Sequence, residues 1–387
     1  MTENRELQLY FHIPFCERKC LYCDFLSAPG SEKEKEAYMD ALLEELEGRA
    51  EDFSDRTVSG IFFGGGTPSL VSGERIKELM EAVRRCYRLS GSAEVTMEVN
   101  PGTADGDKLL CYRSAGVNRL SIGLQSAKDE ELALLGRIHD FDQFLDVWEA
   151  GREAGFQNMS VDIMSALPGQ TLDSFTETLY KVLTLEKPPE HISVYSLIVE
   201  EGTVFAQLFK EGKLILPDED SERFMYGETK RILEEHGYQR YEISNYAKPG
   251  FACRHNCGYW MRKDYLGFGI GSASLIDNVR FQNSRDLRKF LEDPLSCREE
   301  LQRLSREERM EEFVFLGLRM TRGISPLLFR REFGVSLEEI YGGIIEKNQK
   351  DGLLFYRIDP DTEEKMLALT DRGLDLSNYC MAQFLLS

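Results

Sequence analysis

No stretch of the sequence is apolar over the roughly 20 residues that a membrane-spanning helix needs. The first residues, Met1–Glu6, are polar, so we expect neither a signal peptide nor a transit peptide. Positive charge is also scarce, because 47 Lys and Arg residues face 67 Asp and Glu residues and leave a net charge of −20. Such an acidic chain is not expected to bind nucleic acid nonspecifically. These absences predict a cytoplasmic protein with no membrane-spanning segment and no nucleic-acid partner.

The cysteines do not fit a disulfide framework. There are nine, an odd number, in a long chain without a secretion signal. Three of them, Cys16, Cys20 and Cys23, lie within eight residues. In a reducing cytoplasm such a cluster more often binds metal. Zinc sites usually combine two separated cysteine pairs, and a second pair is missing, although an incomplete zinc site or a chance cluster stays an alternative.

The first half of the chain alternates between apolar segments of strand length and amphipathic segments of helix length. Of the 387 residues, 42% are hydrophobic, which is ample for a large core. The predicted strands are Leu7–His12, Ser59–Phe63, Glu94–Val99, Arg119–Leu124, Asn158–Ile163 and His191–Leu197. The predicted helices are Lys33–Arg49, Ser72–Tyr87, Asp105–Ala115, Asp140–Ala154 and Leu172–Leu185. Six strand–helix units in order predict an α/β fold with a parallel sheet, either doubly wound or curled as a partial barrel.

The pattern changes after Thr203. We expect a helix over Ser221–Glu235 and a short strand over Tyr238–Ser244. From about Leu304 the chain predicts small helices and a hairpin. The domain organisation expected from these changes is a partial barrel (1–203), a barrel extension (204–302) and a smaller C-terminal α+β accessory domain (303–387).

Three thiolates on one short loop can hold three corners of a cubane iron–sulfur cluster and leave the fourth iron open to an outside ligand. The spacing Cys-x3-Cys-x2-Cys directly after the first strand resembles the radical S-adenosylmethionine superfamily. This resemblance implies a partial (β/α)6 barrel and a 4Fe-4S cluster on Cys16, Cys20 and Cys23. It also implies that S-adenosylmethionine binds the open iron and that the cluster reduces it by one electron.

Further segments match that superfamily in order. The glycine turn Phe62–Pro68 lacks the Lys-Ser/Thr ending of a phosphate loop. Side chains at the ends of barrel strands project into the mouth where ligands bind, and an arginine can pair with a carboxylate. Taken singly, these residues could be structural turns, caps or surface ion pairs. The resemblance implies that S-adenosylmethionine is bound by Tyr10, Tyr22, Gly65, Gly66, Thr67, Glu98, Gln125, Arg137 and Asp162.

Nearly end to end, the chain resembles the oxygen-independent coproporphyrinogen III oxidase family, HemN and its relatives. The segments that carry this resemblance are Tyr10–Cys23, Gly64–Pro68, Glu98–Gly102, Ser121–Gln125 and Asp162–Gly169. The dehydrogenases of that family have a fourth cysteine two residues after the third and a long N-terminal extension. This chain has Phe25 at that position and only fifteen residues before Cys16. Both departures point away from the dehydrogenases.

A second group of that family, the heme chaperones (HemW), carries the motif His-Asn-x-x-Tyr-Trp, and this chain has His255, Asn256, Tyr259 and Trp260. An imidazole can ligate heme iron and an indole can pack against a porphyrin. The alternative is that His255 and Trp260 are merely packed in the core. Chaperones of this group often have a histidine after a glycine run, but Gly269–Ser274 contains none. No second imidazole ligand is therefore expected from this loop.

The resemblance implies a heme chaperone that passes heme to apo-hemoproteins and retains the 4Fe-4S cluster and the S-adenosylmethionine site. Its recipients would include membrane-bound respiratory proteins, with peripheral docking at the inner face of the membrane. We expect no coproporphyrinogen III dehydrogenase activity and assign no catalytic residue. The alternatives are that dehydrogenase, which decarboxylates propionates with a 5′-deoxyadenosyl radical, and an anaerobic heme-modifying methyltransferase.

Overall fold

A computed structural model describes residues 5–360 and 362–386. One sheet of 12 strands dominates it, in the order β12-β11-β10-β9-β1-β2-β3-β4-β5-β6-β8-β7. The six central strands are β1 (Arg5–Ile13), β2 (Arg56–Gly65), β3 (Arg88–Val99), β4 (Arg119–Gln125), β5 (Met159–Ser165) and β6 (His191–Ser196). Each pairs in parallel with the next. The parallel sheet of the sequence prediction is therefore confirmed.

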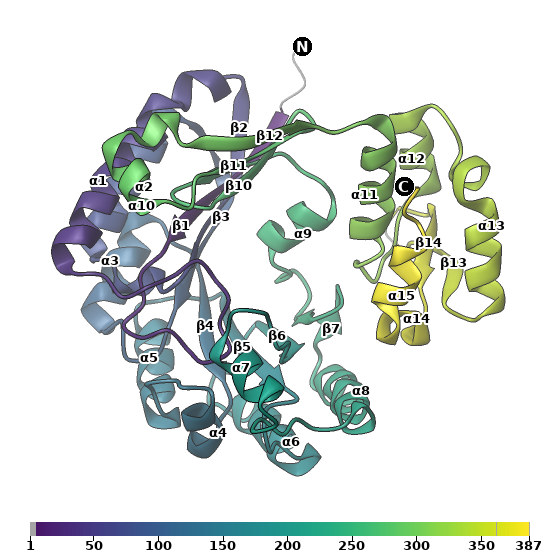
Figure 1. Ribbon diagram of the computed structural model, residues 1–387, viewed down its shortest axis with the longest axis horizontal. Coiled ribbons are helices and arrows are strands. Elements are labelled where there is room, and N and C mark those ends of the chain that lie inside the picture. The colour runs from purple at the N-terminus through teal and green to yellow at the C-terminus, as the bar shows by residue number, and fades with distance from the viewer. Residues whose placement is uncertain (1–4, 361, 387) are drawn as a thin grey trace.

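Six helices follow these strands along the outer side of the sheet (Figure 1). They are α1 (Glu32–Gly48), α2 (Gly73–Cys86), α3 (Gly106–Ala115), α4 (Asp129–Leu134), α5 (Phe141–Glu153) and α6 (Leu172–Leu183). The strand order never reverses between β1 and β6, so right-handed crossovers put all the helices on one side. A doubly wound sheet would reverse its order and carry helices on both faces. The structure is therefore the curled, partial-barrel alternative.

Polar caps and buried strands explain these boundaries. Ser31, Ser72, Asp105 and Asp140 each accept a hydrogen bond from a backbone N–H in the first turn of the helix that follows. All seven residues of β4 are buried, as expected for a parallel strand covered on both faces. Apolar side chains from the sheet and the outer helices form one core cluster.

Short strands extend the sheet at both ends. At one end β9 (Tyr265–Phe268) pairs in parallel with β1, followed by β10 (Ala273–Ile276), β11 (Val279–Asn283) and β12 (Arg298–Arg303). At the other end lie β8 (Asn245–Ala247) and β7 (Gln239–Arg240). Of the single strand predicted over Tyr238–Ser244 only β7 forms, because the buried Glu242 side chain accepts hydrogen bonds from Ser244 N (2.7 Å) and Asn245 Nδ2 (2.6 Å) and turns the chain.

The remaining helices of this region are α7 (Val204–Lys210), α8 (Glu219–Glu235), α9 (Arg254–Trp260) and α10 (Leu287–Glu292). Short 3-10 turns cover Ala50–Phe53, Pro68–Leu70 and Pro294–Ser296. Helix α8 confirms the helix predicted from Ser221, which begins two residues earlier because Asp218 caps it. Helix α9 lies between the sheet and the C-terminal helices (Figure 1).

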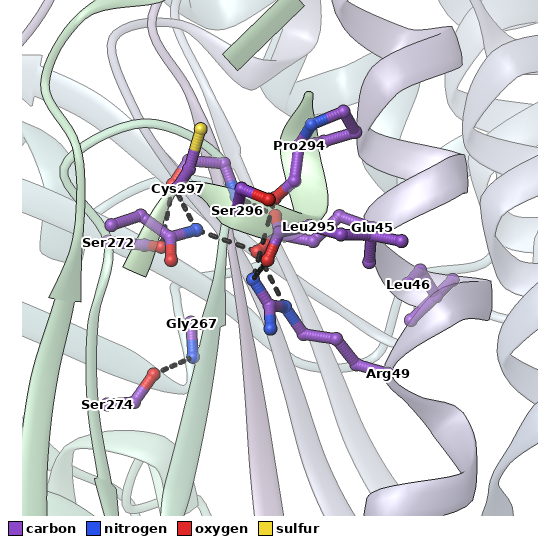
Figure 2. Close-up of polar contacts among 12 residues, drawn as sticks. Glu45, Leu46, Arg49, Gly267, Ser272, Ser274, Pro294, Leu295, Ser296 and Cys297 are labelled. Atoms are coloured by element: carbon purple, nitrogen blue, oxygen red, sulfur yellow. Dashed lines mark hydrogen bonds and ion pairs between the residues drawn. The ribbon is translucent and has the colours of Figure 1, made fainter. Parts of the chain in front are cut away.

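A buried ion pair ties α1 to the extension of the sheet (Figure 2). The Glu45 carboxylate accepts hydrogen bonds from Gly269 N (2.8 Å), Asn283 Nδ2 (2.8 Å) and Arg49 Nε (3.0 Å). Arg49 Nη2 also donates to Leu295 O at 3.1 Å. Burial raises the pKa of the Glu45 carboxyl, and these donors oppose that rise. The glycine run after β9 is thus a junction between α1 and the sheet.

A separate apolar cluster fills the C-terminal part, with Phe329, Tyr341 and Leu367 among its buried members. Its elements are α11 (Arg306–Gly317), α12 (Pro326–Phe333), α13 (Leu337–Lys350), the hairpin β13 (Leu354–Ile358) and β14 (Lys365–Leu369), α14 (Asp371–Asp375) and α15 (Ser377–Ala382). Small helices and a hairpin are as predicted. The division at positions 203 and 303 stays a prediction. Within residues 5–360 and 362–386, no helix combines the length and apolarity needed to cross a membrane.

Candidate functional site

A cavity of about 480 Å³ opens at the carboxyl ends of the parallel strands. The cysteine loop, the glycine turn and the strand-end side chains all line it. The structure brings together in this cavity the predicted residues Cys16, Cys20, Tyr22, Cys23, Gly65, Gly66, Thr67, Glu98, Gln125, Arg137, Asp162 and Asn256. The other four predicted residues, Tyr10, His255, Tyr259 and Trp260, lie outside its lining. Their assigned roles, like those of the lining residues, stay predictions.

The three cysteines of the loop between β1 and α1 are free, partly exposed thiols. Backbone hydrogen bonds shape the loop, from Cys16 N to Ala28 O (3.1 Å) and from Cys23 N to Cys20 O (3.3 Å). Two neighbours donate to sulfur: Thr67 Oγ1 to Cys16 Sγ (3.5 Å) and Arg137 Nη1 to Cys20 Sγ (3.8 Å). Such donors stabilise thiolates and tune iron–sulfur clusters.

This donor set fits a cubane cluster. Among the described residues, no three His, Cys, Asp or Glu side chains form a group that could hold a metal ion. Each thiolate of a cubane binds a different iron, so three cluster ligands need not converge on one point. Three thiols on one loop, with an arginine beside one of them and an open cavity in front, match three occupied irons and one accessible iron.

The glycine turn packs against the cysteine loop. Gly66 N donates to Ile13 O at 2.8 Å and Thr67 N donates to Phe15 O at 2.7 Å. A Cβ on Gly66 would lie 2.6 Å from Phe15 O and 3.0 Å from Cys16 Sγ. Gly65 has a φ of +117°, which L side chains rarely adopt. The glycines therefore serve the loop's packing as well as the approach of a ligand that the sequence predicted.

Two carboxyl groups face the cavity from the inner side of the sheet. Burial raises the pKa of Glu98 to about 8, and the nearby Asp162 charge adds to that rise. Glu98 Oε2 accepts a hydrogen bond from Gly65 N at 3.2 Å. Burial also raises the pKa of Asp162, while hydrogen bonds from Ser193 and Ser121 oppose the rise. Glu98 is thus largely protonated near neutral pH and can donate as well as accept a hydrogen bond.

The side chains of Arg137 and Gln125 are fixed by hydrogen bonds to other residues of the barrel. Arg137 Nη2 donates to Asn100 Oδ1 (2.9 Å) and to Gly123 O (2.8 Å). Gln125 has a left-handed φ of +70° and accepts a hydrogen bond from Tyr195 OH at 2.9 Å. The surface ion-pair alternative is therefore wrong for Arg137, and Gln125, whose side chain is uncharged, is buried. Sequence reasoning missed Asn100 and Tyr195, although each is a polar residue at the end of a strand.

His255 is packed inside the barrel and is only 3% exposed. Its ring stacks on Phe62 with centroids 4.5 Å apart, and Tyr259 meets it edge-on at 4.6 Å. Burial lowers the pKa of His255 to about 3, with Arg119 contributing to the fall. Nδ1 of this neutral ring is buried with no hydrogen-bond partner among the described residues. The packed arrangement, which the sequence left as the alternative, is the one seen in this structure.

Contacts from distant parts of the chain hold helix α9. At the first turn of α9, the backbone N–H groups of Arg254 and His255 donate hydrogen bonds to the Glu94 carboxylate on β3, at 2.9 Å and 3.3 Å. At its last turn, the Arg319 guanidinium lies 4.2 Å from the centroid of the Trp260 ring. Neither Glu94 nor Arg319 was singled out from the sequence, because both lie far from this motif along the chain.

The sequence and the fold have counterparts among known proteins. Residues 10–181 match the Radical SAM superfamily and residues 304–376 match the HemN C-terminal domain. The heme chaperone HemW of Bacillus subtilis is 36% identical over 381 residues, which is 97% of this chain and 98% of that protein. HemW of Escherichia coli is 40% identical over 289 residues, or 74% of each chain.

A mitochondrial relative and a solved structure extend the comparison. The radical S-adenosyl methionine domain-containing protein 1 of Danio rerio is 33% identical over 386 residues, covering 96% of this chain and 84% of that one. The coproporphyrinogen III oxidase HemN of Escherichia coli, a radical SAM enzyme, superposes with a TM-score of 0.84. It is 26% identical, and the match covers 99% of this chain and 91% of HemN. The predicted α/β fold class is confirmed.

Proposed function

The chain belongs to the HemW family of radical S-adenosylmethionine proteins, and on that premise we propose that it binds heme and transfers it to apo-hemoproteins. One observation carries the proposal. The chain aligns over 97% of its length with relatives named as heme chaperones, including one from Lactococcus lactis at 35% identity. We place this activity in the cytoplasm.

Cys16, Cys20 and Cys23 would hold a 4Fe-4S cluster, and S-adenosylmethionine would bind beside it in the cavity. When bound, this pair supplies one-electron chemistry. The cavity of about 480 Å³ is within the size range of small-molecule sites. Glu98, Gln125 and Asp162 line it and would orient the cofactor, while Arg137 donates to Cys20 Sγ and would offer a cation to a carboxylate.

A dehydrogenase is the second candidate, since HemN itself has this fold. Phe25 supports the chaperone over the dehydrogenase. It lines the cavity and is 63% exposed, at the position where the dehydrogenases carry a fourth cysteine. A large apolar side chain at this rim can offer contact to an apolar ligand.

Heme recognition by His255, Asn256, Tyr259 and Trp260 is part of the proposal. His255 is neutral and keeps a nitrogen lone pair free for iron, but its burial requires α9 to shift before heme can reach it. Asn256 already lines the cavity. We further propose that the recipients include membrane-bound respiratory proteins, reached by peripheral docking.

The test combines two assays on anaerobically reconstituted protein. Coproporphyrinogen III, S-adenosylmethionine and a reductant are incubated with it and protoporphyrinogen is quantified. In parallel, heme-loaded protein is mixed with apomyoglobin and the rise of the myoglobin absorbance is followed. Heme transfer without porphyrinogen turnover supports the chaperone. Many turnovers of protoporphyrinogen formation would make the chain a dehydrogenase, and heme binding without transfer would leave only a heme-binding protein.

A further inference from the structure

An arginine at the inner end of the cavity is left without a hydrogen-bonding partner. Arg119, the first residue of β4, is 1% exposed, and its Nε has no hydrogen-bond partner within the described residues. Its side chain nevertheless lines the cavity. A guanidinium has five N–H donors, and burying them without hydrogen-bond acceptors is unfavourable. The site therefore favours a ligand that brings acceptor oxygens.

The neighbouring carboxylates offset the charge of Arg119 but are engaged elsewhere. Glu94 and Asp162 both interact with it electrostatically. One oxygen of Glu94, Oε1, accepts from the backbone of α9, at Arg254 N and His255 N. Those of Asp162 accept from Ser121 Oγ at 3.3 Å. Arg119 thus stays charged, and its N–H groups remain available to a ligand.

The cavity has two ends. Alternate residues of β4 line it from Arg119 to Gln125, a span of about 20 Å along the strand. The outer end holds the cysteine loop and the residues expected to bind S-adenosylmethionine. Cys253, the residue before α9, also lines the cavity and interacts electrostatically with Arg119. Asn256 of α9 lines the same cavity. This second end adjoins the helix that carries the proposed heme motif.

We propose that Arg119 binds a carboxylate of a tetrapyrrole, a heme propionate, at the inner end of the cavity. The inference rests on the proposed function and assigns to Arg119 a role in ligand binding. A guanidinium forms paired hydrogen bonds with a carboxylate, and such bonds are strong where water is excluded. S-adenosylmethionine also carries a carboxylate, so the two sources of this chemistry must be separated by experiment.

The experiment compares heme with iron protoporphyrin IX dimethyl ester, which has no free carboxylates, on reconstituted full-length protein. Dissociation constants come from absorbance titrations, with S-adenosylmethionine binding measured in parallel by calorimetry. The native chain should bind heme about tenfold or more tighter than the ester, the size expected for a charge-assisted pair. Arg119→Met should remove that preference and leave S-adenosylmethionine affinity unchanged. Arg119→Lys, which keeps the charge but loses the paired geometry, should restore part of it.

Matched controls make each outcome decisive. Arg113→Met changes an arginine on α3, outside the cavity lining, and should retain the full preference for heme. If Arg119→Met weakens S-adenosylmethionine binding and keeps the preference, the carboxylate belongs to the cofactor and the proposal fails. Equal binding of heme and ester by the native chain, a measurement that needs no variant, also overturns it. If the native chain binds neither, the proposed chaperone function fails with it.

Discussion

Replacing Gly66 by alanine tests whether the glycine turn positions the cysteine loop. The added Cβ would lie 2.6 Å from Phe15 O, 3.0 Å from Cys16 Sγ and 3.1 Å from Ile13 O. Two of these atoms belong to the backbone, so the contact is not relieved by rotating a side chain. Overpacking of this kind typically costs about 1–3 kcal/mol. Because the clash is with the loop itself, we expect the penalty to fall on the conformation that holds the cluster.

The assay is anaerobic reconstitution followed by iron and sulfide analysis and by the visible absorbance of the cluster. A penalty of about 1–3 kcal/mol corresponds to roughly 5- to 150-fold weaker retention of the cluster. Gly66→Ala should therefore lose cluster under dilution or mild chelation that the native chain withstands. Thermal unfolding of the cluster-free protein should change less, since the loop is only one part of the molecule.

Gly91→Ala is the matched control. Gly91 lies in β3, and a Cβ placed there would meet nothing within 4 Å. This variant should keep its cluster and should unfold at the native temperature or slightly above it. If Gly66→Ala retains the cluster as firmly as Gly91→Ala does, the turn does not constrain the loop and the packing argument is refuted.

Three further predictions concern the interior of the barrel. The pKa of Glu98 is raised to about 8 from its ordinary 4.5, so the stability this group contributes is complete below pH 4.5 and is lost as the pH rises through 8. Cluster-free Glu98→Gln should thus lose less thermal stability than the native chain between pH 6 and pH 9, and parallel melting curves would contradict this. Glu94→Ala should destabilise α9 by about 0.5–2 kcal/mol through loss of its cap, seen as faster amide exchange there, whereas unchanged exchange would show that the cap is not needed. His255→Ala should weaken heme binding and shift the absorbance of bound heme, and a native-like spectrum would exclude His255 as an iron ligand.

The cluster loop and the strand-end residues could be predicted because their signals are local. Three cysteines within one loop, and polar residues such as Glu98 near the end of an apolar strand or Asp162 within one, indicate a ligand site in any parallel barrel sheet. The orientation of the remaining side chains depends on contacts made far along the chain. Glu94 caps α9 across 160 residues, as measured from Arg254, and no sequence pattern near either residue indicates that bond.

The strand predicted over Tyr238–Ser244 forms only at Gln239–Arg240, for a similar reason. The Glu242 side chain accepts a hydrogen bond from Ser244 N, and Glu242 also forms a β-bridge with Met320 in the C-terminal part. Local propensity was overridden by a tertiary contact. The same holds for Gly66, because the lack of space for a Cβ beside the cysteine loop cannot be foreseen from a glycine run alone.

The predicted cluster ligands and the predicted heme ligand differ in how accessible they are. The cysteines are partly exposed at the cavity, whereas His255 is stacked under Phe62 with a buried nitrogen left unpaired. An unsatisfied buried nitrogen costs about 1–3 kcal/mol, which coordination to iron would recover. The Glu94 cap and the stacking of Arg319 on Trp260 oppose the release of His255, and each contributes about 0.5–2 kcal/mol. Because these terms are of similar size, the proposed capture of heme at α9 would depend on the balance of these contacts rather than on the stability of the whole barrel.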